Sequence, residues 1–141
     1  MSNDIVAEAR TYLGVPWVHQ GRSRDGVDCL GLAILVAGAT RGYTFDLRDY
    51  AAQAMDETMQ AKCIEHMDPV LLAELAPGHV VVIRFENQRH MAIVGEYPVA
   101  GNLSLIHANS RVGKVVEHRL DSVWRRMIMS AYSLRDLRGG A

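Results

Sequence analysis

Asp28 and Cys29 stand where a glycine-rich loop gives way to a strongly apolar stretch, and that stretch predicts a buried helix beginning at Cys29. The loop, residues 14–27, is dense in turn formers: Gly14, Pro16, Gly21, Ser23, Asp25 and Gly26. At a helix start, unpaired N–H groups and the helix dipole favour a thiolate and can hold an oxyanion. The sequence therefore makes Cys29 a candidate nucleophile. The alternative interpretation is a small buried hydrophobic residue.

A nucleophilic thiol needs a base within hydrogen-bond reach and a third group that orients the base. His90 begins one predicted strand, and His107 lies at the end of the next. If the two strands form a hairpin that turns near Pro98 and Val99, residues whose numbers sum to about 197 lie opposite each other. His90 then faces His107. We therefore predict that these two histidines supply the base for Cys29 and the group that orients that base.

The elements that must position these residues differ between the two halves of the chain. The first half is mostly helical: residues 5–13, a buried helix from Cys29 to Ala37, a weak pattern over 49–67, and a short helix opened by Asp68-Pro69. The second half carries strand patterns at residues 79–85, 90–95, 103–108, 114–119 and 128–135, with one helical turn at 121–127. These patterns predict an α+β fold in which the nucleophile begins a buried helix packed on a roughly five-stranded antiparallel sheet.

Composition sets limits on the class of protein. The chain has 141 residues, 49% of them hydrophobic and 22% charged, which is typical of one globular domain spanning residues 1–141. A formal charge of −1 gives no net field for nucleic acid, and no apolar run approaches the roughly 20 residues of a membrane span. The first ten residues do not resemble a secretory signal, so we expect synthesis in the cytoplasm.

Other polar residues carry weaker predictions. His19 lies in the loop before Cys29, where it could line a substrate cleft, and Trp17 lies in the same loop. The alternatives are a solvated histidine and a tryptophan that packs in the core. Cys63 and His66 are three residues apart, which could form half of a zinc site, but a complete structural site usually has two such pairs. We expect no metal and no other cofactor.

The chain resembles the NlpC-type cell-wall cysteine peptidases, which have a compact papain-like domain. The resemblance covers most of the chain and rests on ordered segments: Leu13-Gly14-Val15-Pro16-Trp17, Gly21, Gly26-Val27-Asp28-Cys29-Leu30-Gly31-Leu32, Leu75-Ala76-Pro77-Gly78, His90-Met91-Ala92-Ile93-Val94 and Ile106-His107-Ala108. It implies a cysteine endopeptidase that hydrolyses amide bonds in peptidoglycan stem peptides. In its triad Cys29 is the nucleophile, His90 the base and His107 the polar residue that orients the base. It also implies that Asp28 contacts the substrate.

Trp17 and Leu30 depart from the family pattern, which commonly has tyrosine and serine at these positions. They resemble the branch found in phage tails and gene-transfer particles. That branch implies a virion component that acts at the periplasm or cell wall beside tail proteins. Because Trp17 lacks the tyrosine hydroxyl, a weakly active or inactive tail-tip component is the alternative. A third possibility is an acyltransferase or amidase with the same triad, and an apolar groove beside Cys29 would favour it.

Overall fold

The computed structural model describes residues 2–48, 50, 57–85, 88–97 and 101–139. Helices in this part of the chain are α1 (Ser2–Arg10), α2 (Cys29–Arg41), α3 (Glu57–Ile64) and α4 (Ser122–Met127), with a 3-10 helix η1 (Leu72–Glu74). The strands are β1 (Arg22–Ser23), β2 (Gly26–Val27), β3 (Met67–Val70), β4 (Val80–Phe85), β5 (Gln88–Glu96), β6 (Leu103–Asn109), β7 (Lys114–Arg119) and β8 (Ile128–Leu134). None of the helices in the described ranges is both long and apolar enough to cross a membrane.

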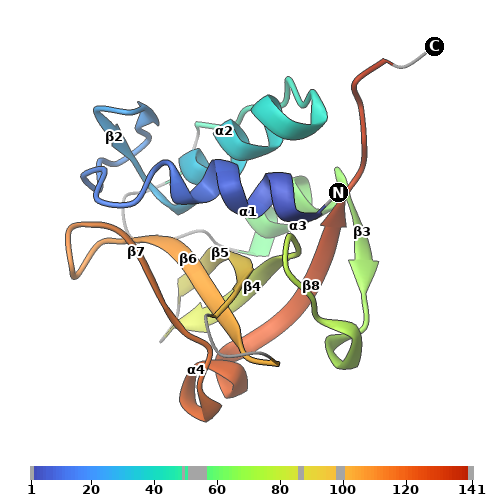
Figure 1. The fold of residues 1–141 in the computed structure, drawn as a ribbon. Coiled ribbons are helices and arrows are strands. Elements are labelled where there is room, and N and C mark those ends of the chain that lie inside the picture. The colour runs from blue at the N-terminus through green and yellow to red at the C-terminus, as the bar shows by residue number, and fades with distance from the viewer. Residues whose placement is uncertain (1, 49, 51–56, 86–87, 98–100, 140–141) are drawn as a thin grey trace.

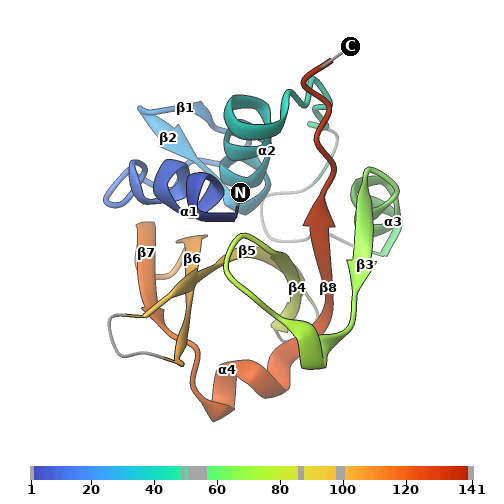
Figure 2. The ribbon, with the colours of Figure 1, turned by 45° about the vertical axis from the view of Figure 1, so that its right-hand side comes forward.

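The main sheet has six antiparallel strands in the order β3-β8-β4-β5-β6-β7. Helices α1 and α2 lie together on one side of this curved sheet, and α4 lies at the opposite end of the molecule (Figures 1 and 2). Strands β1 and β2 form a small hairpin inside the predicted loop of residues 14–27. The α+β class and the five predicted strands are confirmed, and β3 adds a sixth.

Strand β3 corrects one prediction. Asp68 and Pro69 do not open a helix; they lie within β3, and only the 3-10 turn η1 follows. Pro69 fits there because β3 is the edge strand and pairs with β8 alone, so the missing N–H of the proline breaks no ladder through the sheet. Among the described residues of the helical pattern predicted over 49–67, the helix is α3, and residues 49 and 51–56 lie outside the described residues.

Helix α2 begins and ends at well-formed caps. The Asp28 side chain accepts a hydrogen bond from the N–H of Gly31, and Gly42 ends the helix in the left-handed region at φ 76°. Buried residues of α2 pack on the sheet: Leu30 shares a core cluster with Met91, and Leu32 shares another with Ile93. The apolar surface of α2 thereby fixes the position of its first residue, Cys29, beside β5.

The pairing of β5 with β6 differs from the prediction by two residues. Ile93 lies opposite Ile106, so paired numbers sum to 199 rather than 197, and His90 is not directly opposite His107. The predicted turn at residues 98–99 lies outside the described residues. Because side chains alternate with a period of two, an even shift keeps both histidines on the same face of the sheet, where diagonal neighbours can still touch.

Candidate active site

Cys29 is the first residue of α2 and is half-buried where the helix meets β5. The N-cap engages the N–H of Gly31, and the Asp28 carbonyl accepts from the N–H of Leu32. Neither contact uses the first-turn N–H groups of Cys29 and Leu30. The position therefore offers a thiol beside backbone donors that can face a developing oxyanion.

Burial raises the pKa of the Cys29 thiol to about 12. The backbone N–H of Met91 and that of Leu30 act in the opposite direction, whereas the negative charge of Asp28 raises the pKa further. The lowered pKa expected from a helix start is therefore not found in this structure, because burial outweighs the donors.

His90 lies near the beginning of β5, one residue before Met91, whose N–H acts on the thiol. Among the described residues, no hydrogen bond joins Cys29 to His90. Contacts between a nucleophile and its base are often long without substrate and shorten in the complex, so the neighbouring positions are compatible with a catalytic pair. The charge of Asp28 raises the pKa of His90, but burial has the larger effect and lowers it to about 4.

The structure brings the two predicted histidines into contact. His90 Nε2 lies 2.7 Å from His107 Nδ1, and the two rings meet nearly perpendicularly, at 80°. His107 is 1% exposed, and burial together with the neighbouring imidazoles lowers its pKa to about 2. Both rings are therefore neutral at pH 7, so each carries a single proton on nitrogen.

A third histidine, His118, extends this contact and was not among the predicted site residues. Its Nε2 lies 2.8 Å from His107 Nε2, and its Nδ1 lies 3.0 Å from the carbonyl oxygen of Arg119. The sequence feature that could have indicated this contact is the register of the β6–β7 hairpin. In the β6–β7 hairpin His107 lies opposite Val116, which places His118 two residues further along the same face.

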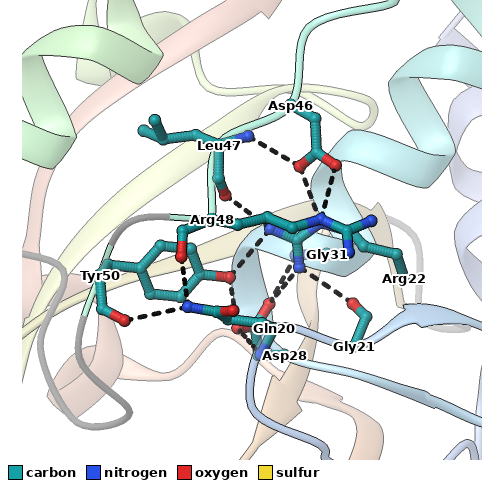
Figure 3. A network of polar contacts seen from close by, with 9 residues as sticks. All are labelled: Gln20, Gly21, Arg22, Asp28, Gly31, Asp46, Leu47, Arg48 and Tyr50. Atoms are coloured by element: carbon teal, nitrogen blue, oxygen red, sulfur yellow. Dashed lines mark hydrogen bonds and ion pairs between the residues drawn. The ribbon is translucent and has the colours of Figure 1, made fainter.

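Asp28 is 3% exposed and sits at the centre of a polar network (Figure 3). Its Oδ1 accepts from Gly31 N–H at 2.7 Å and from the Arg22 guanidinium at 3.2 Å. Its Oδ2 accepts from the Tyr50 hydroxyl at 2.6 Å and from Gln20 N–H at 2.8 Å. All four described partners belong to the protein, so the predicted substrate contact of Asp28 stays a prediction.

Arg22 joins this network to the segment that follows α2. Its guanidinium donates to the Leu47 carbonyl at 2.7 Å and to the Tyr50 hydroxyl at 2.9 Å, and it pairs with Asp46 at 2.9 Å. Gln20 also donates from its side chain to the carbonyl of Arg48 (Figure 3). The loop before Cys29 and the segment after α2 are thus tied together around the Asp28 carboxylate.

The other two predicted substrate-binding residues lie in the loop that leads to Asp28. Trp17 is partly buried against the cluster between α1, α2 and the sheet, and its backbone N–H donates to the Gly113 carbonyl. His19 meets the Tyr50 ring edge-on at 5.6 Å. Its buried Nδ1 has no hydrogen-bond partner within the described part of the chain. Contact of either residue with substrate stays a prediction.

Cys63 and His66 have packing positions, and neither takes part in the described contacts between His90, His107 and His118. Cys63 is buried in the cluster below α2, and His66 stacks on Phe45 at 4.0 Å. Both line an apolar pocket that also includes Leu30 and Met91. At about 40 Å³ this pocket is far smaller than the 300–1,000 Å³ of most ligand sites, so it offers little room for an acyl chain.

Comparison with known proteins identifies the family. Residues 14–133 match the NlpC/P60 family over most of the chain and include Cys29, His90 and His107. The chain belongs to the NlpC/P60 family. No curated protein sequence matches it.

Solved structures share the fold, among them two of NlpC/P60 proteins. The NlpC/p60 domain of the peptidoglycan hydrolase SagA is 21% identical, with a TM-score of 0.65, covering 95% of this chain and 99% of that one. An NlpC/P60 family protein from Bacillus cereus is also 21% identical, with a TM-score of 0.66, covering 97% of this chain and 40% of that longer one. An N-acetylmuramoyl-L-alanine amidase from Bacteroides uniformis is 18% identical, with a TM-score of 0.58, covering 95% and 98%. The papain-like NlpC/P60 architecture expected from the sequence is thereby confirmed.

Proposed function

We propose that this NlpC/P60 protein is a cysteine peptidase that hydrolyses amide bonds in the stem peptides of peptidoglycan. The observation that carries the proposal is the 2.7 Å contact between His90 and His107. It is supported by the place of Cys29 at the first turn of α2, where the N–H of Met91, the residue after His90, acts on the thiol. Family membership adds support. The similar SagA domain is that of a peptidoglycan hydrolase, and the Bacteroides uniformis neighbour is an N-acetylmuramoyl-L-alanine amidase.

The proposed reaction has two steps at one carbonyl. His90 takes the proton of the Cys29 thiol as sulfur attacks the carbonyl carbon, and first-turn N–H groups of α2 stabilise the oxyanion. The intermediate collapses when His90 gives that proton to the leaving amine, which leaves a thioester on Cys29. Water, deprotonated by His90, then attacks the thioester and releases the carboxylic acid and the free thiol.

Neighbouring groups act on this proton transfer. The buried negative charge of Asp28 raises the pKa of both His90 and Cys29, so it favours the imidazolium but disfavours the thiolate. His107 holds the ring of His90 through the 2.7 Å contact. We also propose that His19 binds substrate, because its buried Nδ1 lacks a partner among the described residues and a buried polar atom calls for one. Trp17 lies in the same loop and would border the same region.

The test is hydrolysis of purified muropeptides, followed by mass spectrometry, with three proteins. We expect cleavage by the wild type and by Cys63→Ala, since Cys63 is a buried packing residue with no described hydrogen bond to His90 or His107. We expect no cleavage by Cys29→Ala. Equal turnover by the wild type and Cys29→Ala would refute the proposal, and loss of turnover in Cys63→Ala alone would move the chemistry to the other thiol.

We further propose that the enzyme acts in a phage-tail-like particle at the periplasm or cell wall and contacts tail proteins there. The support is the resemblance of the Trp17 and Leu30 positions to the tail-associated branch. A tagged copy expressed in its own host should sediment with particles on a density gradient, and tail proteins should crosslink to it. A tagged protein found only in the soluble fraction would contradict this part of the proposal.

The raised pKa of Cys29 favours a second candidate function, a tail-tip component that binds the wall with little turnover. A thiol with a pKa of about 12 holds little thiolate at neutral pH. If that candidate is correct, iodoacetamide labels Cys29 no faster than a free thiol at pH 7, and labelling leaves binding to peptidoglycan sacculi unchanged. Muropeptide turnover by the wild type that stops on labelling of Cys29 decides for the peptidase.

A further inference from the structure

The contact between His90 and His107 is the first part of a longer chain of imidazoles. The other ring nitrogen of His107, Nε2, lies 2.8 Å from Nε2 of His118. Nδ1 of His118 lies 3.0 Å from the carbonyl oxygen of Arg119. Successive rings are nearly perpendicular, at 80° and 85°. The proposed function uses only the first two of these imidazoles, so the role of the third is open.

The Arg119 carbonyl determines where the protons in this chain lie. A carbonyl oxygen only accepts, so Nδ1 of His118 must carry the proton that it donates. In the neutral ring Nε2 of His118 is then bare, and it accepts the Nε2 proton of His107. Nδ1 of His107 is bare in turn, and it accepts the Nε2 proton of His90. Nδ1 of His90 is left without a proton.

Packing keeps the three rings in this order. Trp124 on α4 stacks against His118 with ring centres 4.6 Å apart and against His107 at 5.3 Å. His107 is almost fully buried, and burial lowers the pKa values of His90 and His107, so neither ring takes a second proton at pH 7. When His118 is also neutral, each ring carries one proton, and the direction of one hydrogen bond fixes the direction of the next.

We propose that His118 is a positioning residue that sets the tautomer of His90 through His107. With Nδ1 of His90 bare, the ring can accept the proton of Cys29; in the opposite tautomer that nitrogen already carries a proton and cannot act as the base. His118 touches neither the thiol nor the substrate in this scheme. The inference rests on the proposed function for its consequence in catalysis, but the proton order itself can be measured without any activity.

The first experiment measures the tautomers of the wild-type chain by two-dimensional NMR of ¹⁵N-histidine-labelled protein at pH 7. We expect protonated Nε2 and bare Nδ1 at His90 and His107, and the reverse at His118. Cross-peaks between ring nitrogens and carbon-bound ring protons distinguish the two forms. A proton on Nδ1 of His90 would overturn the proposal, and this measurement needs no variant.

The second experiment compares two substitutions with a matched control. His118→Phe keeps a ring against Trp124 but removes the acceptor of His107, whereas His118→Gln restores an acceptor oxygen. His66→Gln is the control, because the described ring contact of His66 is with Phe45 and not with any of the three imidazoles. One hydrogen bond biases an equilibrium about two- to tenfold, so we expect His118→Phe to lower kcat by about that factor with KM unchanged. A form with Nδ1 protonated should appear at His107.

The Gln variant and the control should keep kcat within about twofold of the wild type. Equal losses in His118→Phe and His118→Gln with unchanged tautomers would reduce His118 to a packing residue and overturn the proposal. If the wild type cleaves no muropeptide, the proposed function fails while the NMR result still decides the proton order. If it cleaves and the tautomers are reversed, the function stands and the role of His118 is refuted.

Discussion

Asp28 gives the sharpest test of the site, because the structure and the family resemblance assign it different tasks. The resemblance makes it a substrate contact, whereas the structure surrounds it with four donors from the protein. The informative substitution is Asp28→Asn, which keeps size and shape. If the carboxylate serves only the substrate, the Asp28→Asn variant loses activity but keeps its stability. If the carboxylate also holds the loops together, the variant loses both activity and stability.

The structure sets the expected magnitude. Asn and Asp are about equal as N-caps, so the bond from Gly31 N–H to the cap survives at little cost. The amide has one acceptor oxygen, so its NH₂ must face Gln20 N–H and the Tyr50 hydroxyl, and a buried donor without an acceptor costs about 1–3 kcal/mol. Arg22 also loses a charged partner, in a pair whose side chains are only 7% and 5% exposed. Removing one partner of a buried pair costs about 3–5 kcal/mol. Since Arg22 keeps Asp46, we expect a loss of about 3 kcal/mol.

Asp121→Asn is the matched control. Asp121 caps α4 with the same extended backbone and accepts from Trp124 N–H at 3.0 Å, but it is exposed. The free energy of unfolding, extrapolated from urea titrations, should therefore change by less than about 0.5 kcal/mol in this variant. If Asp28→Asn costs no more than Asp121→Asn, the reasoning from the network is refuted and Asp28 is free to serve the substrate alone.

Two further predictions concern the histidines and the loop. Burial holds the pKa of His90 near 4 and that of His107 near 2, below the unfolded value of about 6.5, so the unfolded state binds more protons in acid. The contribution of these two histidines to the free energy of unfolding should be complete above pH 6.5 and fall toward pH 4. Between pH 7 and 5 the free energy of unfolding of His107→Gln should fall by about 2 kcal/mol less than that of the wild type. An identical decline in the two proteins would contradict the lowered pKa of His107. A Cβ on Gly31 would lie 2.1 Å from the Gly21 carbonyl oxygen, whereas one on Gly38 meets nothing closer than 3.3 Å. Thermal denaturation should therefore show Gly31→Ala strongly destabilised and Gly38→Ala nearly unchanged, and equal melting temperatures would show that the loop moves aside freely.

Local patterns were sufficient to predict most of the sheet. The β-branched runs and short polar connections of the second half describe hairpins, whose pairing partners are close in sequence. Strand β3 was missed because its partner, β8, lies some 60 residues away, and because Asp68-Pro69 is also a typical helix start. Only the assembled sheet shows that Pro69 occupies an edge where its missing N–H does no harm.

Side-chain contacts across hairpins were partly predictable from the sequence. The contact of His90 with His107 followed from strand alternation and survived a register error of two, because an even shift preserves the face. Strand alternation in the next hairpin, β6–β7, likewise puts His118 on the face of the sheet that carries His107. The network around Asp28 was not predictable in this way, since Tyr50 comes from an irregular segment 22 residues away and no repeat period relates it to the carboxylate.

The chemistry of Cys29 shows how magnitudes decide between two correct principles. A helix start stabilises a nearby negative charge by about 0.3–1 kcal/mol, and by up to about 2 in favourable geometry. Raising the thiol pKa from 9 to about 12 corresponds to roughly 4 kcal/mol against the thiolate. The effect of burial on the thiolate is therefore larger than that of the helix start. His90 is biased in the same direction, because its lowered pKa favours neutral imidazole. The resting pair is therefore thiol and imidazole rather than thiolate and imidazolium. On the proposed mechanism, proton transfer then accompanies attack on the carbonyl, which makes the bare Nδ1 of His90 the condition for any reaction.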